Sequence, residues 1–349
     1  MQFHSQKIAI VGAATLLGKE LNEVLSSSTF GPSDFLLMDD EEMLGKLEAA
    51  GDEVTFVQRI EPTAFEGCDF VFFAAQPEIT EKHWQAARQA GACVIDLTET
   101  LEKQPGVVVL APWIPAEMTT ERRKSLLDLQ TTAVVPAHPA AMLLALVAAR
   151  CHKSVSVRSL WATLLLSASE FGNAAIMELH QQTINLLSFQ SLPQDVFGAQ
   201  AAFNLAVSLG EEGQVRPVQA EENIRRHYAA ISSGNLPELN LQVVQAPVFH
   251  GYALSVAVEL ESAVTLAAMQ AALTGEHIEI VTETAAAPGN IGITGEAGMT
   301  LLARSASGAP GASTRYWLWI AADNLRLAAI NAVACAVEMG RLRPQGKVQ

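Results

Sequence analysis

The chain has 349 residues, of which half are apolar and 17% are charged. A chain longer than about 300 residues usually divides into two domains, and this composition excludes a disordered protein. The formal net charge of -15 argues against a broad surface for nucleic acid or anionic lipid, because both need a basic face. We therefore expect a two-domain globular protein that binds neither nucleic acid nor membrane.

The cysteines are scattered and show no metal-binding or redox spacing. They are Cys68, Cys93, Cys151 and Cys335. Isolated thiols are typical of a reducing compartment. The apolar start of the chain is too short for a signal peptide, and no apolar run reaches the roughly 20 residues that span a bilayer. We expect a cytoplasmic protein without a bound metal.

The first part of the chain alternates apolar strands with helical segments. Strands are expected at residues 7–11, 34–38, 69–75, 93–97, 105–112 and 132–137. Their continuous apolar runs favour a parallel sheet that is buried on both faces. The first strand ends in a glycine turn and is followed by a helix, which is typical of a dinucleotide-binding α/β unit.

The pattern changes after residue 137. Long strands then alternate with few helices, which favours an α+β domain with a mixed or antiparallel sheet. Helices are expected at residues 140–150 and about 173–187. We interpret residues 209–240 mainly as a polar loop, and we place His227, in the basic segment IRRHY, on the surface of a helix. A last helix is expected from a cap at Asp323 or Asn324 to Gly340.

The order of the motifs resembles that of aspartate-semialdehyde dehydrogenases. They are GAATLLG (12–18), VIDLT (94–98), HPAAML (138–143), AFN (202–204), APVFHGYALSV (246–256) and DNLRLAAINAV (323–333). The resemblance implies a Rossmann-like domain over residues 1–137, joined by a C-terminal helix in 323–349. It also implies a glyceraldehyde-phosphate-dehydrogenase-like α+β domain over 138–322, which carries substrate binding and dimerisation, and hence a homodimer.

The chemistry that the resemblance implies depends on side chains that this chain lacks. The family reduces an aspartyl phosphate through a cysteine thioester, and Ala141 occupies the cysteine position. A methyl group cannot form a thioester. Tyr252 replaces the acid/base histidine, Leu166 replaces the glutamine that orients the substrate, and Gln245 replaces an arginine. The resemblance therefore implies vestigial positions and no catalytic residue.

The cofactor turn departs from the family in the same direction. Its outer glycines Gly12 and Gly18 remain, but Thr15 puts a branched side chain where the family has a glycine against the pyrophosphate. Acids at residues 39–42 oppose the 2'-phosphate of NADP, whereas an acid after the second strand can bind the ribose of NAD. We expect no cofactor, with NAD or NADP as the alternative. The weak candidate contacts are Gly12, Ala13, Thr15, Leu16, Leu17 and Gly18.

The resemblance also gathers His138, Glu170, His250 and Tyr252 around the former substrate pocket. Two imidazoles and a carboxylate form a donor set for a divalent metal. Because the spacing of these residues is not that of a dedicated metal motif, we favour a hydrogen-bonded polar plug in a disused pocket.

The scaffold motifs persist and the reactive side chains do not. We therefore expect a catalytically inactive relative of the amino-acid-biosynthesis enzyme, with a structural, regulatory or ligand-sensing role, either as a homodimer or with an active paralogue. The alternative is an NAD(P)-dependent oxidoreductase that works without a cysteine nucleophile and uses His138, His250 or Tyr252 as its acid.

Overall fold

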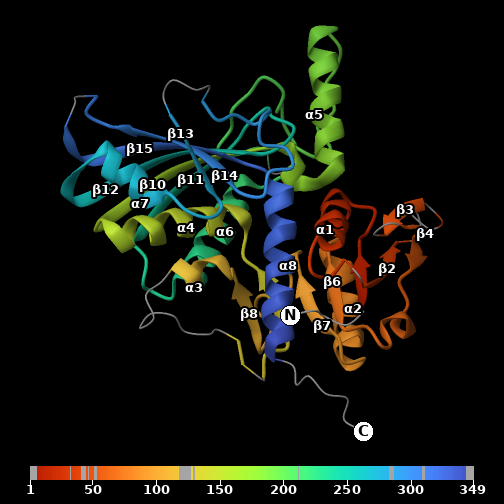
Figure 1. Ribbon diagram of the computed structural model, residues 1–349. Helices are drawn as coiled ribbons and strands as arrows, with labels where there is room; N and C mark the ends of the chain where they lie inside the picture. Colours follow the sequence, from red (N-terminus) through yellow and green to blue (C-terminus); the bar gives the residue numbers. More distant parts are fainter. Residues whose placement is uncertain are drawn as a thin grey trace. The chain divides into compact units, whose positions relative to one another are not determined.

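The chain divides into two structural units (Figure 1). The first comprises Met1–Pro112, Lys124–Ala137 and Ala328–Gln349, and the second comprises Trp113–Arg123 and His138–Leu327. The computed structural model describes residues 6–31, 33–40, 45, 47–50, 53–117, 127–128, 130–210, 212–282, 287–308 and 311–342. Within these ranges, none of the helices combines the length and apolar character needed to span a bilayer.

A seven-stranded parallel sheet in the order β5-β2-β1-β6-β7-β9-β8 forms the first unit. Its strands are β1 (Lys7–Val11), β2 (Asp34–Asp39), β5 (Gln58–Arg59), β6 (Phe70–Phe73), β7 (Cys93–Asp96), β8 (Val107–Leu110) and β9 (Ala133–Pro136). A separate antiparallel pair consists of β3 (Leu47–Ala50) and β4 (Glu53–Phe56). This arrangement is the Rossmann-like sheet that the apolar runs predict.

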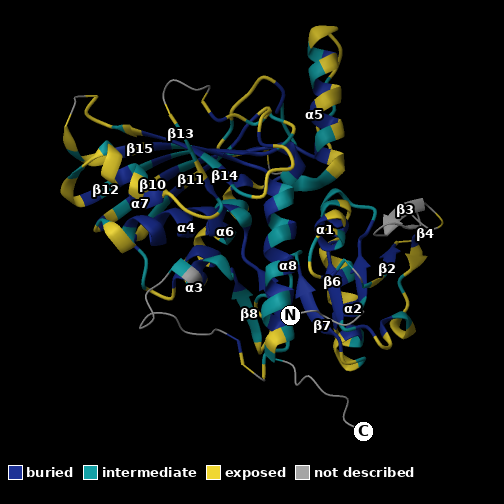
Figure 2. Cartoon of the chain, in the orientation of Figure 1, coloured by how far each residue is buried: buried dark blue, intermediate teal, exposed yellow. Residues whose placement is uncertain are grey.

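The central strands of this sheet are buried on both faces, and β6 and β7 are dark blue in Figure 2. Because strand side chains alternate between faces, Ile8 and Ile10 join one core and Ala9 joins the other. The first core is completed by α1 (Leu16–Ser26) and the last helix, α8 (Asn324–Leu342). The second is completed by α2 (Pro77–Gln89) and the short 3-10 turn η2 (Pro62–Phe65).

The second unit contains a six-stranded mixed sheet in the order β11-β10-β12-β15-β14-β13. The pairs β10–β11 and β13–β14 are parallel, and the other neighbours are antiparallel. The strands are β10 (Val157–Leu166), β11 (Glu238–Gln245), β12 (Tyr252–Thr265), β13 (Ile278–Val281), β14 (Met299–Ser305) and β15 (Ala312–Ala322). The sheet is of the mixed kind that the sequence favours.

Helix α4 (Pro139–Ser154) is the centre of the second unit. Every side chain from residue 140 to residue 151 is buried, because α4 contacts β10, α3 (Trp113–Glu117), α6 (Pro217–Ser232) and α7 (Leu266–Leu273). Helix α5 (Gly172–Leu187) projects from the same unit (Figure 1). The side chains at the start of α4 are therefore held by packing on several sides.

Two sequence expectations about helices are wrong. Residues 217–232 form α6 rather than a loop, and its buried face is made by Ile224, Tyr228 and Ile231. Helix α8 runs through Gly340 to Leu342, because packing of its apolar face against the first sheet outweighs the glycine stop signal. Its cap is as predicted, since the backbone N–H of Arg326 donates to Asp323 Oδ1 at 3.0 Å.

Candidate functional site

Leu166, Gln245 and Tyr252, three of the positions where the resemblance places reactive or substrate-binding residues, lie together at one end of neighbouring strands in the second sheet. Strands β10 and β11 are parallel and both end there, with Leu166 paired to Gln245. Tyr252 begins β12, which runs antiparallel to β10 at this edge. All three residues are buried, and the Gln245 amide donates to the carbonyl oxygens of Leu166 and Ala246. The Gln245 side chain is thus held by backbone carbonyl groups at the ends of β10 and β11.

The fourth vestigial position, Ala141, lies in the first turn of α4 and is fully buried. The nearest cysteine along this helix, Cys151, is ten residues away, or about 15 Å along the axis. Burial raises the pKa of the Cys151 thiol to about 12, so that it remains a thiol at neutral pH. All four cysteines are free and buried. The second unit therefore offers no thiolate at the start of α4.

The side chain of Glu170 accepts hydrogen bonds from three different elements. Glu170 lies in the 3-10 turn η3 (Ala168–Phe171). His138 Nε2 lies 2.9 Å from Oε1, while the Tyr252 hydroxyl donates to Oε2 at 2.5 Å. The Asn324 amide also donates to Oε2, at 3.2 Å. These contacts join the start of α4, the start of β12 and the start of α8 around one carboxylate.

The proton on His138 is fixed by its other ring nitrogen. His138 caps α4, and its Nδ1 accepts the backbone N–H of Ala140 at 3.2 Å. Since Nδ1 is an acceptor, the neutral ring carries its hydrogen on Nε2 and donates it to Glu170. The backbone N–H of His138 donates to Nδ1 of His227 at 2.8 Å. His227 is completely buried against α4, so its predicted surface position is wrong.

Glu170 is held in its ionised form. Burial raises the pKa of its carboxyl, but His138, Tyr252 and Asn324 together lower it by more, so that the pKa lies below its ordinary value. The side chain is 17% exposed. A fixed negative charge consequently stands where the resemblance places a pocket for a doubly negative substrate.

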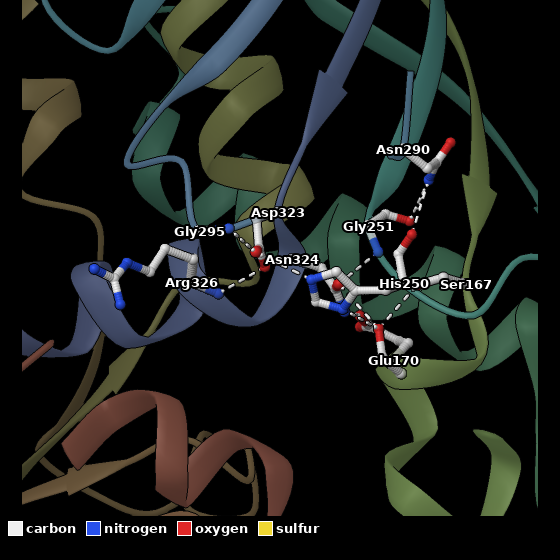
Figure 3. A network of polar contacts seen from close by, with 10 residues as sticks. Ser167, Glu170, His250, Gly251, Asn290, Gly295, Asp323, Asn324 and Arg326 are labelled. Carbon is white, nitrogen blue, oxygen red and sulfur yellow. Dashed lines mark hydrogen bonds and ion pairs between the residues drawn. The ribbon is translucent and has the colours of Figure 1, made fainter. Parts of the chain in front are cut away.

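A second carboxylate, that of Asp323, holds His250 (Figure 3). His250 Nε2 lies 3.0 Å from Asp323 Oδ2, which also accepts the backbone N–H of Gly295 at 2.8 Å. Burial raises the pKa of the Asp323 carboxyl, and hydrogen bonds from His250, Arg326 and Gly295 lower it by more. The cap of α8 thereby orients a histidine that is itself 27% exposed.

Ser169 and Asn324 lie on the Nδ1 side of His250. The backbone N–H of Gly251 donates to Asn324 Oδ1 at 3.1 Å, so this atom is an acceptor and also takes the Ser169 hydroxyl proton at 3.0 Å. The Ser169 oxygen also lies 3.2 Å from His250 Nδ1 and 3.0 Å from the Ser167 hydroxyl oxygen. His250 thus contacts Asp323 through Nε2 and Ser169 through Nδ1.

Ser169, His250 and Asp323 form a chain of contacts of the kind that activates a serine nucleophile. Burial opposes that role, because Ser169 is only 1% exposed and its hydroxyl also contacts Ser167 and Asn324. Asn324 joins these residues to Glu170, His138 and Tyr252, and we call the whole set the polar network.

Both imidazoles of the expected pocket are engaged by carboxylates of this chain. His138 contacts Glu170 and His250 contacts Asp323. Among the residues that the structure describes, no group of three or more His, Cys, Asp or Glu side chains is placed to hold a metal ion. Each of these two imidazoles is therefore paired with a carboxylate.

In the first unit, Gly12 and Gly18 are required by backbone geometry. Gly12 has φ +87°, and a Cβ there would lie 2.5 Å from the backbone nitrogen of Ala75. A Cβ on Gly18 would lie 2.0 Å from the carbonyl oxygen of Gly12. The turn is thus as tight as the sequence predicts.

The hydroxyl of Thr15 is directed into the glycine turn. Its hydroxyl donates to the carbonyl oxygens of Gly12 and Ala74, at 2.8 and 3.0 Å, and accepts the backbone N–H of Gly18 at 2.9 Å. These contacts hold the hydroxyl inside the glycine turn, where it caps the N-terminus of α1. The residue that we expected to obstruct a pyrophosphate therefore stabilises the turn.

Asp39 ends β2 and brings a buried carboxylate to the same turn. It is 4% exposed, and its Oδ2 accepts the backbone N–H of Ala14 at 2.8 Å. Its Oδ1 accepts the backbone N–H of Asp40 at 2.9 Å. Glu41 and Glu42, the other acids of the expected run, lie outside the described residues. One acid of that run is thus fixed beside the glycine turn.

Comparison with known proteins covers most of the chain. The family model described as Semialdehyde dehydrogenase, NAD binding domain, matches residues 7–121, and Semialdehyde dehydrogenase, dimerisation domain, matches residues 143–327. A USG-1 protein homolog of Pseudomonas aeruginosa is 31% identical over 330 residues, which is 93% of this chain and 95% of the relative. An aspartate-semialdehyde dehydrogenase of Rickettsia bellii is 25% identical over 257 residues, which is 74% of each.

Solved structures show the same likeness. A probable aspartate-semialdehyde dehydrogenase from Pseudomonas aeruginosa has a TM-score of 0.80 at 29% identity and covers 96% of this chain and 98% of its own. Aspartate semialdehyde dehydrogenase II from Vibrio cholerae shares the fold, with a TM-score of 0.82 at 23% identity, and covers 97% and 99%. By sequence and fold, the chain belongs to the semialdehyde dehydrogenase family.

Proposed function

We propose that this chain is a catalytically inactive member of its family, with a structural, regulatory or ligand-sensing role. The observation that carries the proposal is Ala141, a fully buried methyl group at the position of the family's nucleophile. A thioester needs a thiolate. The Cys151 thiol on the same helix is remote, and burial raises its pKa to about 12.

The polar network supports the same proposal through charge. The ionised Glu170 occupies the hydrogen-bond donors of His138, Tyr252 and Asn324. A doubly negative acyl phosphate would face this carboxylate with those donors already used. Like charges at short range in a buried site repel strongly. Substrate binding is therefore disfavoured as well as the chemical step.

Turnover of aspartate semialdehyde tests the proposal. We expect that the purified chain, given phosphate and either NADP or NAD, forms reduced cofactor at least about a thousandfold more slowly than an active family dehydrogenase measured alongside it. The variant Ala141→Cys supplies only a thiol and should remain inactive. A rate of the native chain within about a few hundredfold of the active enzyme contradicts the proposal, whereas activity in Ala141→Cys alone would show that the missing thiol is the whole cause.

We further propose that the first unit binds NAD in preference to NADP as a ligand. The residues fit a dinucleotide, since Gly12 and Gly18 keep the turn tight and the Thr15 hydroxyl is directed inward. Asp39 ends the second strand, where an acid accepts the adenosine ribose hydroxyls of NAD and repels the 2'-phosphate of NADP. Bound NAD would supply a hydride acceptor.

Calorimetry separates the two cofactors. We expect NAD to bind below millimolar concentration and NADP to bind at least about tenfold more weakly. Asp39→Ser should weaken NAD about tenfold and remove the preference. Asp40→Ser, at the exposed neighbouring residue, is the matched control and should change neither. If neither NAD nor NADP binds at millimolar concentration, the proposal is contradicted.

A second candidate function is an oxidoreductase without a covalent intermediate. The observation that favours it is His250, a partly exposed imidazole held by Asp323, which is the arrangement of a general acid. NADH-dependent reduction of small aldehydes and ketones, in which His250 would protonate the carbonyl oxygen as hydride arrives, would support this function over an inactive one if it is abolished in His250→Gln. Absence of hydride transfer with a panel of such substrates would reject it.

We also propose a homodimer formed through the open face of the second sheet. Trp161, Ala257 and Trp317 are in register across β10, β12 and β15 and therefore share that face. The two tryptophans are 59% and 50% exposed, and hollows of about 290 and 240 Å³ adjoin Trp317. Exposed indoles beside hollows are typical of self-complementary contacts. The dimerisation-domain match favours a second copy as the partner.

Light scattering after size exclusion tests this interface. We expect about twice the chain mass of 37.3 kDa for the native protein. The double variant Trp161→Lys/Trp317→Lys should be monomeric, whereas Gln85→Lys on the exposed surface of α2 should not. A dimer that survives the double variant contradicts this face. Co-expression with a differently tagged active paralogue shows whether mixed dimers form.

A further inference from the structure

The donors around Glu170 are arranged as in a binding site for a carboxylate. His138 donates to one carboxylate oxygen, and Tyr252 and Asn324 donate to the other. The donors come from the starts of α4, β12 and α8, which are separate elements. Three donors on two oxygens match a monocarboxylate, whereas a phosphate presents more oxygens and a second charge.

Each donor is positioned without help from Glu170. The ring of His138 is fixed by the Ala140 N–H on its Nδ1. The amide of Asn324 is fixed by the Gly251 N–H and the Ser169 hydroxyl on its Oδ1. The donors should therefore keep their directions when the Glu170 side chain is removed.

Packing fixes the third donor in the same way. Tyr252 is completely buried, and its ring is nearly parallel to that of His138, with centroids 6.2 Å apart and an interplanar angle of 14°. A phenol in this position cannot turn its hydroxyl to water without moving the ring. Removal of Glu170 would take away the carboxylate that accepts this hydroxyl proton.

Buried donors without an acceptor are costly, so the space favours any anion that restores their hydrogen bonds. We propose that Glu170 is an internal ligand, seated in a latent binding site for small monocarboxylates that His138, Tyr252 and Asn324 form. The side chain of Glu170 closes this site in the native chain. The inference holds whether or not the chain is an enzyme, because it depends only on the three donors.

Anion rescue of Glu170→Ala tests the site. Thermal unfolding is followed in sodium formate, sodium acetate and sodium chloride at equal ionic strength. We expect formate to raise the Tm of Glu170→Ala saturably, by about 2–4 °C beyond chloride. The native protein and Glu170→Gln, whose amide fills the space, should show no such excess. Equal Tm values for Glu170→Ala in formate and chloride overturn the proposal.

Two further measurements keep the test decisive. The double variant Glu170→Ala/Tyr252→Phe removes one donor, and we expect formate to bind it about tenfold more weakly than it binds Glu170→Ala. If Glu170→Ala does not fold in chloride, refolding in formate should recover soluble, cooperatively unfolding protein. Equal failure to refold in both salts also counts against the proposal.

Discussion

The glycine turn of the first unit and the polar network of the second differ in what fixes their residues. In the turn, Gly12 and Gly18 are demanded by backbone contacts that any Cβ would violate. In the network, polar side chains such as Tyr252 and Glu170 bind one another, and the buried Ala141 lies nearby at the start of α4. Under the proposed function, residues required by the fold are retained, and those required only by the reaction are replaced.

The largest expected effect is on the turn. Gly12→Ala adds a Cβ at 2.5 Å from Ala75 N at a φ of +87°, so we expect a loss of about 3 kcal/mol or more in the free energy of unfolding. Gly91→Ala is the matched control, because Gly91 has φ +88° and nothing within 4 Å, and should lose about 1 kcal/mol. Equal losses, measured by urea unfolding, would show that the close approach is unimportant.

The next effect tests the network. Glu170→Ala leaves buried donors without an acceptor and should lower the free energy of unfolding by about 2–3 kcal/mol. Glu81→Ala, on the exposed surface of α2, should change it by less than about 0.5 kcal/mol. A Glu170→Ala protein as stable as the native chain would show that the network does not hold the second unit together.

The pH dependence gives a smaller effect of definite sign. The pKa of Glu170 in the folded chain lies below its unfolded value of about 4.3. Its ionisation therefore stabilises the fold above that value, and the stabilisation is lost as pH falls through the folded pKa. The native protein should exceed Glu170→Gln by about 1–2 kcal/mol at pH 7.

Urea unfolding at several pH values measures this difference. The excess stability of the native protein over Glu170→Gln should shrink below about pH 4.3. An excess that stays constant between pH 7 and the acid transition would show that the pKa of Glu170 is not lowered by folding. The Asp323 carboxyl is present in both proteins, so its own titration cancels.

The smallest expected change in the free energy of unfolding distinguishes the contribution of the Thr15 hydroxyl from that of the side chain's size. Thr15→Val removes the helix cap and the bonds to Gly12 and Ala74, at a cost of about 1 kcal/mol. Thr15→Ser keeps the hydroxyl and should stay within about 0.5 kcal/mol of the native protein. If the two variants unfold at the same urea concentration, the hydroxyl does not fix the turn.

Much of the fold is predictable from the sequence because its signals are local. The parallel strands appear as apolar runs, and the cap at Asp323 is a short-range pattern. The extent of helix α6 was missed because its apolar residues, Ile224 and Ile231 among them, are interrupted by charged residues, and the segment as a whole looks polar. The signal was present in their spacing, which is that of one helix face.

The site was only partly predictable because its contacts are distant in the chain. Glu170 and Asn324 are 154 residues apart, and His138 and His227 are 89 apart. Motif order places Ala141 and Tyr252 near a former pocket, yet it carries no information about which polar groups pair. The inward hydroxyl of Thr15 depends on a rotamer, which also leaves no trace in the sequence.

A burst experiment tests the loss of thioester chemistry most directly. High concentrations of the chain are mixed with aspartate semialdehyde and NADP, or NAD, without phosphate, and reduced cofactor is followed through the first turnover. A family enzyme with its cysteine should form up to one reduced cofactor per protomer as the thioester accumulates. This chain is predicted to form none, and a burst approaching one per protomer would contradict the account.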